Sequence, residues 1–355
     1  MKAKLSVIIK AFIICLMFAG AFFAASQIIV PRYVYQNSDY STTSTVRGFY
    51  QLKRNTCDVL ILGTSHFVNA MIPQEIYDRK QIRSYNLASE QQSPFLSCYL
   101  LKEALKYQSV QAVVMDCNFL TRFNDEEAIN MSDELFRKVS DNMRFSLNKI
   151  QMINEYTELN GGGEKLSYFL PIIRYHSRWK DINKEDLEVL TYTKHNELKG
   201  FYPLYHEAGV GFTPIDITGD KKEPMDELMR EYLERITGIC VKENIKLILV
   251  NTPENKATVE RHNEIKAYAD EKGIKYYDLS ERSLYERMEI SEPKESVTEP
   301  DGGEHANLYA AVKISKLIAE LLEENGVTGK KDSQWGDTET YYRKIFDDPL
   351  FVKQK

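Results

Sequence analysis

The chain has 355 residues, of which 43% are hydrophobic and 28% are charged. This composition is typical of a folded globular protein, so most of the chain is not embedded in a membrane. A net charge of −6 provides no basic surface for a polyanion, which excludes nucleic acid as an expected partner. The length suits one large domain that carries an insertion.

The N-terminal segment differs from the rest, because almost every residue from 5 to 30 is apolar. A run of this length can cross the roughly 30 Å hydrocarbon core of a bilayer. A cleaved signal peptide is the alternative, with Ala19-Gly20-Ala21 as a weak small-residue cleavage site. Because apolar residues continue beyond that site to Val30, we favour an uncleaved anchor over residues 1–30.

The charges that flank this anchor predict its orientation. Lys2, Lys4 and Lys10 precede or open the apolar run, whereas Arg32 is the only cation shortly after it. The positive-inside rule then places the N-terminus in the cytoplasm and the rest of the chain outside. We therefore expect a single-pass protein of the cell membrane, with an extracellular C-terminal domain on a polar stalk over residues 31–53.

Residues 54–329 alternate between strand-like and helix-like segments. Short apolar runs predict five strands, at Val59–Leu62, Arg83–Leu87, Gln111–Asp116, Ile245–Asn251 and Lys275–Leu279. Helical spacing is found at Phe95–Tyr107, Met225–Glu243, Lys256–Lys272 and Tyr309–Glu324. Such alternation predicts an α/β fold, a flavodoxin-like three-layer αβα sandwich around a parallel sheet of about five strands.

Two segments interrupt this pattern. Residues 118–224, between the third and fourth strands, are far longer than an ordinary connection. They are polar, aromatic and mostly helical, and we interpret them as an insertion that caps the carboxyl edge of the sheet. The tail, residues 330–355, is polar with aromatic residues, and either packs on the domain or reaches a partner.

The cysteines and histidines do not form a metal-binding pattern. Outside the apolar run the cysteines are Cys57, Cys98, Cys117 and Cys240, which we interpret as buried free thiols. His195, His206 and His262 lack metal-ligand spacing, so structural roles are expected for them. We predict neither a metal nor a cofactor.

The first candidate catalytic motif follows the first strand, where Gly63, Thr64 and Ser65 end the apolar run. A hydroxyl at such a turn lies at the carboxyl edge of the sheet, where open α/β folds bind their ligands. It also lies near the positive end of the next helix, which favours negative charge on oxygen. Ser65 is therefore a candidate nucleophile, and the alternative is that Thr64 and Ser65 only cap the helix.

The second motif precedes the last helix, in the sequence D-G-G-E-H-A-N from Asp301 to Asn307. A carboxylate shortly before a histidine can fix the imidazole tautomer, while the other ring nitrogen takes a proton from a serine. The alternative is an acidic loop that only caps the helix, with Asn307 as the N-cap.

Together, the strand–G-T-S turn, the parallel α/β sheet and the histidine loop resemble the SGNH/GDSL hydrolase superfamily. The resemblance covers about residues 57–116 and 245–324. It is closest to the membrane-anchored SGNH-like proteins of Gram-positive bacteria that work beside membrane-bound O-acyltransferases or in teichoic-acid alanylation. The family motif is G-D-S where this chain has G-T-S, its second-block glycine is missing, and its G-x-N-D string is absent.

The resemblance implies catalytic roles for three residues. Ser65 matches the nucleophile, His305 the general base and Asp301 the orienting acid. The family places the acid three residues before the histidine, but Asp301 stands four residues before it. The loop must therefore bulge at Asp301, or Glu304 substitutes for it, or the histidine works in a dyad.

The same resemblance implies an oxyanion hole. Its expected donors are the backbone amides of Ser65 and of Ala88 or Ser89, with the side chain of Asn118 after the third strand. One such hydrogen bond can lower the barrier by ~3 kcal/mol.

Two further features of the sequence have less specific interpretations. Arg174, His176, Arg178 and Trp179 cluster in the insertion. They are candidates for binding an anionic or sugar substrate, or else form a solvated helix face. His66 follows Ser65 directly, and because adjacent side chains diverge we expect a packing role for it.

The expected activity is that of an extracytoplasmic serine esterase or O-acyltransferase without a cofactor. Its substrate would be acyl groups of a cell-envelope polysaccharide or teichoic acid, and a membrane-bound O-acyltransferase is a possible partner. The alternatives are a secreted esterase for small esters and a non-catalytic accessory protein. The accessory alternative predicts that Ser65 and His305 lie too far apart to hydrogen-bond.

Overall fold

The fold is given by a computed structural model that describes residues 2–32, 42–120, 132–204, 211–290 and 305–336. In this part of the chain, the centre is a five-stranded, fully parallel sheet in the order β2-β1-β3-β4-β5. The strands are β1 (Val59–Leu62), β2 (Ser84–Asn86), β3 (Ala112–Asp116), β4 (Lys246–Asn251) and β5 (Lys275–Asp278). The α/β class and the five predicted strands are confirmed.

Alternation along β1 explains why both faces of the sheet are covered. Leu60 and Leu62 point into one hydrophobic core, and Val59 and Ile61 into another, and all four are fully buried. A strand that buries both faces has a continuous apolar sequence, which is the pattern of this run.

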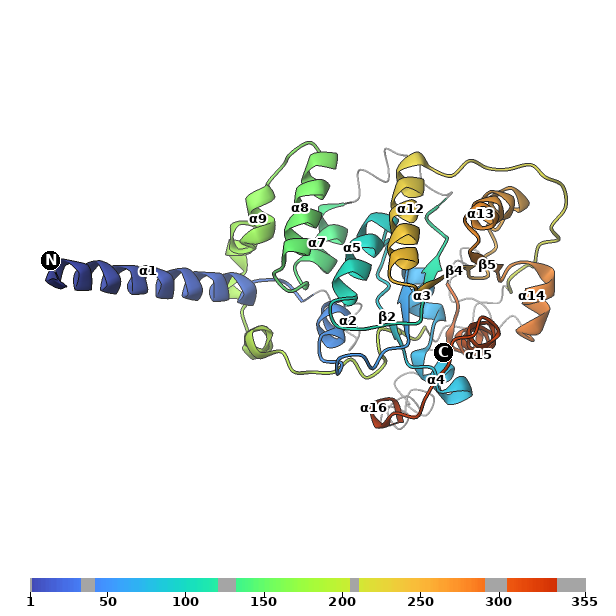
Figure 1. Cartoon of the computed structure of the whole chain (residues 1–355), viewed down its shortest axis with the longest axis horizontal. Coiled ribbons are helices and arrows are strands. Elements are labelled where there is room, and N and C mark those ends of the chain that lie inside the picture. Colours follow the sequence, from blue (N-terminus) through green and yellow to red (C-terminus); the bar gives the residue numbers. More distant parts are fainter. Residues whose placement is uncertain (1, 33–41, 121–131, 205–210, 291–304, 337–355) are drawn as a thin grey trace.

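The two faces of the sheet are covered by different helices (Figure 1). α5 (Pro94–Ala104), α12 (Glu227–Lys242) and α13 (Val259–Lys272) contribute to one core, whereas α3 (Ser65–Ala70), α4 (Pro73–Lys80) and α15 (Leu308–Glu324) contribute to the other. The remaining helices beside the sheet are α14 (Arg282–Arg287) and α16 (Ser333–Gly336). Two layers of helices around a parallel sheet make the predicted αβα sandwich.

Helix α1 (Lys2–Ile28) projects away from this sandwich (Figure 1). Within it, Ser6–Ile28 has a mean hydropathy of 2.5 and is long enough to cross a membrane. Large apolar side chains along the helix are exposed, Met17 and Phe18 by 69% and 73%. A helix with apolar residues on all sides and no protein around it is suited to lipid rather than to water.

The stalk predicted over residues 31–53 is wrong for its second half. Residues 42–49 form helix α2, whose Val46 and Phe49 are buried in the core that contains α5. Tyr85 donates a hydrogen bond from its hydroxyl to the carbonyl of Thr45 at 2.8 Å. The physical reason is that two apolar side chains three residues apart share one helix face and bury it, although the segment is polar overall.

The insertion forms a helical extension of the domain. It contains α7 (Asp133–Ser140), α8 (Leu147–Leu159), α9 (Lys165–Phe169), α10 (Ile172–Tyr175), η1 (His176–Lys180), α11 (Lys184–Leu187) and η2 (Glu188–Thr191). Phe136 and Tyr156 stack at 3.7 Å between ring centroids and join the core with Phe95 of α5. These helices lie between the sheet and α1 and pack against α5 (Figure 1), and a cap over the carboxyl edge stays a prediction for them.

The end of the insertion returns to the sheet. Lys199 accepts a hydrogen bond from the amide of Asn86 at 2.9 Å, and Tyr202 donates its amide to the carbonyl of Val68. Gly200 has φ +90°, and a Cβ there would lie 1.8 Å from the carbonyl oxygen of Asn86. Only glycine permits this approach, which places residues 198–204 beside α3.

The described part of the tail packs on the domain. Trp335 is fully buried and donates from its indole nitrogen to the carbonyl of Ser84 at 3.3 Å. The side chain of Lys199 lies 5.1 Å from the centre of its ring. The first of the two alternatives for the tail therefore holds up to residue 336.

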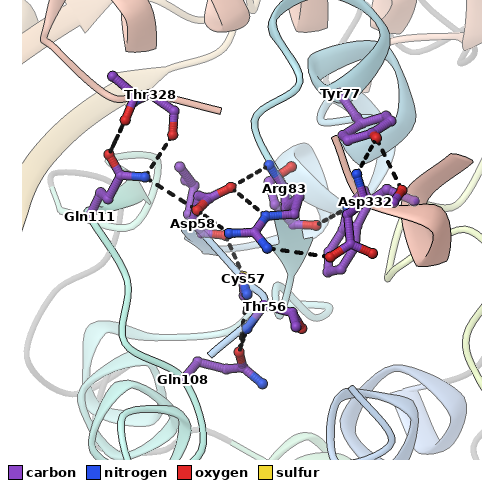
Figure 2. A network of polar contacts seen from close by, with 12 residues as sticks. Thr56, Cys57, Asp58, Tyr77, Arg83, Gln108, Gln111, Thr328 and Asp332 are labelled. Carbon is purple, nitrogen blue, oxygen red and sulfur yellow. Dashed lines mark hydrogen bonds and ion pairs between the residues drawn. The ribbon is translucent and has the colours of Figure 1, made fainter. Parts of the chain in front are cut away.

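A buried ion pair lies at the amino edge of the sheet (Figure 2). Arg83 donates from Nε and Nη2 to both carboxylate oxygens of Asp58, at 2.7 and 2.6 Å. Asp332 faces the same guanidinium at 3.4 Å, and Gln111 donates to Asp58. The hydrogen bonds that Arg83 donates to Asp58 raise the pKa of Arg83, so the guanidinium stays charged.

Candidate active site

The turn after β1 brings Ser65 to the carboxyl edge of the sheet. β1 lies between β2 and β3 in the sheet. The chain runs from β1 to β2 on one side and from β3 to β4 on the other, so the switch point where such folds bind ligands lies between β1 and β3. Gly63 permits the closest approach there, because a Cβ on it would lie 2.2 Å from the Cβ of Asp116 on β3. Ser65 is the first residue of α3 and is half-buried.

Thr64 fixes the conformation of this turn. Its hydroxyl donates to the Oδ2 of Asp116 at 2.5 Å, its amide donates to the same oxygen at 3.0 Å, and its hydroxyl accepts from the amide of His66. It is thus the N-cap of α3, as the capping alternative predicts for Thr64. Ser65 is left to interact with another part of the chain.

His305 lies opposite Ser65. Its Nε2 is 2.8 Å from the Oγ of Ser65, and the histidine is half-buried like the serine. Asn307, two residues later, caps α15 by accepting from the amide of Ala310. The capping alternative thus holds for Asn307, and the cap anchors the segment that presents the imidazole, whereas the role of His305 as a base stays a prediction.

This geometry suits proton transfer. A distance of 2.8 Å between a hydroxyl oxygen and an imidazole nitrogen is within the 2.6–3.2 Å reach of a general base. A serine paired in this way can attack an acyl carbonyl. The predicted orienting acids, Asp301 and Glu304, lie outside the described residues.

A second histidine, His66, packs against His305. The rings of His66 and His305 are 4.9 Å apart between centroids and are tilted by 31°. His66 is only 4% exposed, its Nδ1 is 3.2 Å from the hydroxyl of Thr64, and its Nε2 is 3.8 Å from the Oε2 of Glu254. The expected packing role of His66 is thus accompanied by polar contacts that link β1, β3 and the loop after β4.

Sequence reasoning did not identify Asp116 and Glu254 as parts of this site. Both are 3% exposed, and Asn118 donates its amide side chain to Glu254 at 3.2 Å. One signal was present, since each carboxylate follows or ends a strand at the carboxyl edge of a parallel sheet. The strand order, which places β3 beside β1, is the information that a single sequence lacks.

The predicted oxyanion donors need a correction. The amide of Ala88 donates to the Oδ1 of Asn86 at 3.0 Å, and the amide of Ser89 donates to the carbonyl of Gly63 at 3.0 Å. Both amides are therefore occupied, that of Ala88 within the β2 segment and that of Ser89 by the turn after β1. Asn118 is likewise engaged by Glu254, and the amide of Ser65 is the donor at this edge that no described residue binds.

The predicted substrate-binding cluster lies elsewhere. Arg178 donates to the carbonyl of Ile29 at 2.8 Å and pairs with Asp186, and Arg174 pairs with Asp133. His176 contacts the backbone carbonyl of Ile173 in the preceding helix α10, and Trp179 is 65% exposed. Arg178 thus contacts the end of α1, and Arg174 contacts α7. A substrate-binding role for Arg174, His176, Arg178 and Trp179 stays a prediction. A local cluster of residue types does not reveal which face of the fold it occupies.

The buried thiols do not compete with Ser65. Cys117, directly after β3, is 1% exposed, and burial raises its pKa well above the ordinary thiol value. Cys57, Cys98 and Cys240 are buried and unpaired as well. Within the described ranges, no three His, Cys, Asp or Glu side chains are arranged to hold a metal ion.

Structural roles were expected for three histidines, and the structure describes two of them, His195 and His262. Their surroundings differ. His262 is buried, with its Nδ1 3.1 Å from the Oδ2 of Asp278, whereas His195 is exposed. His206 lies outside the described residues.

Comparison with known proteins gives little more. No protein-family model matches the chain, and no curated protein matches it. A solved structure of a candidate acylhydrolase from Bacteroides fragilis is similar, with 12% identity over 79% of this chain and 94% of that chain. Its TM-score is 0.35. A likeness this distant does not support an assignment of function, so any proposal depends on the geometry around Ser65.

Proposed function

We propose that this chain is a membrane-anchored serine esterase or O-acyltransferase of SGNH type. Its proposed substrates are acyl groups on a cell-envelope glycan or teichoic polymer, and its proposed partner is a membrane-bound O-acyltransferase. The observation that carries the proposal is the 2.8 Å contact between the Oγ of Ser65 and the Nε2 of His305. The accessory alternative predicted that these groups are too far apart to hydrogen-bond, so this distance favours catalysis.

The geometry suggests a two-step reaction. Ser65 attacks the acyl carbonyl as its proton moves to His305, and a bond forms between Oγ and the carbonyl carbon. The ester C–O bond then breaks, and His305 gives the proton to the leaving alcohol. In the second step a water or a sugar hydroxyl gives its proton to His305 and attacks the acyl-serine. His305 returns that proton to the Oγ of Ser65 as the acyl group leaves.

The turn around Thr64 supports this reaction by positioning the nucleophile. Its two hydrogen bonds to Asp116 hold the backbone on either side of the turn, so the hydroxyl of Ser65 is pre-oriented toward His305. The amide of Ser65, at the start of α3, is the proposed first donor to the oxyanion. No bound metal or cofactor takes part in this scheme.

The anchoring part of the proposal is supported by the length and apolar character of Ser6–Ile28. Together with the lysines that precede this span, it suggests a cytoplasmic N-terminus and a domain on the outer face of the membrane.

The experiment is an acyl-transfer assay with the full chain in detergent micelles. The chain is incubated with p-nitrophenyl acetate, with and without a teichoic or glycan acceptor, and mass spectrometry follows the acetyl group. Release of p-nitrophenol that requires Ser65, with acetate on the acceptor, supports transfer. Acetate released only to water supports the small-ester alternative, and no turnover by a folded chain supports the accessory alternative.

A further inference from the structure

A polar cavity lies at the C-terminal end of α1, among residues that the proposed reaction does not use. Its volume is about 250 Å³, well above the roughly 30 Å³ of liquid water per molecule, so it has room for a small polar group. Phe23 and Gln27 of α1, Arg47 of α2, and Arg144 and Lys149 of the insertion all line it. Three separate parts of the chain therefore meet around one space.

The charges around this cavity are unbalanced. Arg47, Arg144 and Lys149 line it as cations, against the single carboxylate of Asp141. Lys149 is only 5% exposed, and its ammonium donates to the carbonyl of Met143 at 3.2 Å. No ion pair to a carboxylate is formed by these three cations within the described part of the chain. Burial lowers the pKa of Lys149, and the charges of Asp141 and Glu103 offset this only in part, so an anion in the cavity would stabilise the ammonium further.

Asp141, the single carboxylate, is shared between cations on two sides, because Lys149 and Arg137 both offset the burial that raises its pKa. Asp141 accepts from the hydroxyl of Tyr175 at 3.1 Å, and its Oδ1 is 3.8 Å from Arg137. Arg47 donates only to neutral acceptors, which are the side chain of Asn142 at 2.8 Å and the carbonyl of Val189 at 3.3 Å. The surplus charge of the cavity therefore comes from Arg47, Arg144 and Lys149.

The position of the cavity along α1 places it at the surface of the proposed membrane. Gln27, which lines the cavity, lies one residue before Ile28, where the apolar span ends, about 1.5 Å along the helix axis. The end of a span that crosses the hydrocarbon core lies beside the headgroup region. Phe145 packs edge-on against Phe23 at 6.1 Å, and both Phe145 and Leu190 line the cavity while they are 59% and 49% exposed. The mouth is therefore apolar and the interior is cationic.

We propose that this cavity binds the phosphate group of an anionic lipid in the leaflet next to the domain. Lys149 and Arg47 contact the phosphate oxygens inside, and Arg144, whose guanidinium lies 4.5 Å from the ring centre of Tyr50, contacts them at the entrance. Phe145 and Leu190 lie against the start of the acyl chains. This inference rests on the proposed membrane anchoring of α1, but not on the proposed catalysis.

The test measures lipid binding to the full chain in detergent micelles by native mass spectrometry. Dioctanoyl phosphatidylglycerol, dioctanoyl phosphatidylcholine and inorganic phosphate are titrated separately. We expect one molecule of phosphatidylglycerol to bind, at least 10-fold more tightly than phosphatidylcholine or inorganic phosphate. Equal binding of the two lipids would overturn the proposal, and equal binding of inorganic phosphate would overturn the lipid as its source.

Variants tie the binding to the cavity. Lys149→Met and, independently, Arg47→Gln should each weaken phosphatidylglycerol binding at least 10-fold. Lys165→Met, which removes an exposed lysine of α9 in the same insertion, should leave it unchanged. An unchanged affinity in both cavity variants would refute the proposed site. Ser65→Ala should bind the lipid normally, so failure of the proposed catalysis and failure of this site are distinguishable.

Discussion

The amino and carboxyl edges of the sheet are built from similar polar residues but differ in how those residues are satisfied. At the amino edge, Arg83 and Asp58 are 4% and 6% exposed, and their charges meet through two parallel hydrogen bonds (Figure 2). At the carboxyl edge, Asp116 is equally buried, but it holds a turn whose next residue, Ser65, is half-buried and whose hydroxyl, among the described residues, contacts the imidazole of His305.

This difference separates a structural network from a chemical one. Buried charges that are paired with each other, as in Arg83 and Asp58, gain little from contact with a ligand, and they hold the strands together. A half-buried hydroxyl that follows a turn held by a buried carboxylate, as Ser65 follows Thr64, can react. The two edges therefore make opposite predictions: variants at the amino edge should cost stability, whereas variants of the Ser65 pair should cost activity.

The largest expected effect is on activity. His305→Ala should lower the rate of ester cleavage by about 10³-fold, because general-base catalysis contributes 10²–10⁴-fold. The free energy of unfolding should change little, since His305 is half-buried. Steady-state ester hydrolysis and thermal unfolding measure the two quantities. His195→Ala, at an exposed histidine, is the control and should keep its activity. If His305→Ala loses no more activity than this control, the contrast between the two edges is wrong.

The largest expected effect on stability is at the other edge. Arg83→Met should lower the free energy of unfolding by about 3–5 kcal/mol, because it leaves the buried carboxylate of Asp58 without its counter-ion. The folded fraction should keep its esterase activity. Arg79→Met is the matched control, because Arg79 pairs with Glu320 at the surface and should contribute at most about 1 kcal/mol. Denaturant unfolding that ranks these variants in the reverse order would contradict the account.

Lys149 sharpens the comparison because it is a buried charge without such a partner. Burial lowers the pKa of Lys149 from 10.5 to about 8. Between these two values the folded protein has lost a proton that the unfolded chain still binds, so stability rises with pH through this window. At pH 7 the folded chain still bears the cost of the buried charge.

Lys149→Met should therefore raise the free energy of unfolding at pH 7 by roughly 1–3 kcal/mol. It should also flatten the rise in stability between pH 8 and 10. Unfolding of wild type and variant across this range checks both statements, and a parallel pH dependence of the two proteins would argue against a charged, buried Lys149.

A smaller effect is expected at the turn itself. Thr64→Val removes the hydrogen bond from the hydroxyl to Asp116 and should cost about 1 kcal/mol in unfolding free energy. The rate of ester cleavage should fall about 10-fold, because Ser65 loses its pre-orientation. Thr64→Ser keeps the hydroxyl and should restore both values. Failure of this rescue would mean that the methyl group, rather than the hydrogen bond, matters at this position.

The sheet was predictable because its information is local. The buried strands are continuous apolar runs, and Gly63 and Asn307 mark a turn and a helix cap by residue type alone. The two catalytic candidates followed from such turns. That Ser65 and His305, 240 residues apart, come within 2.8 Å is a property of the fold that only the family resemblance suggested.

The remaining features depend on which strands are neighbours. The register pairs Val59 with Ser84, which sets Asp58 opposite Arg83 one residue earlier, but β1 and β2 must be known to pair before this ion pair can be inferred. The same reason explains the occupied amide of Ser89, since its acceptor belongs to the neighbouring turn. The stalk prediction failed because a polar composition concealed the two buried side chains of α2.

The most direct test of the central claim is covalent labelling of Ser65. The full chain in detergent micelles is treated with a fluorophosphonate and read by intact mass, beside Ser65→Ala and His305→Ala. The account predicts a single adduct on the wild type, none on Ser65→Ala and much slower labelling of His305→Ala. A folded wild type that stays unmodified, or an adduct that persists in Ser65→Ala, would contradict it.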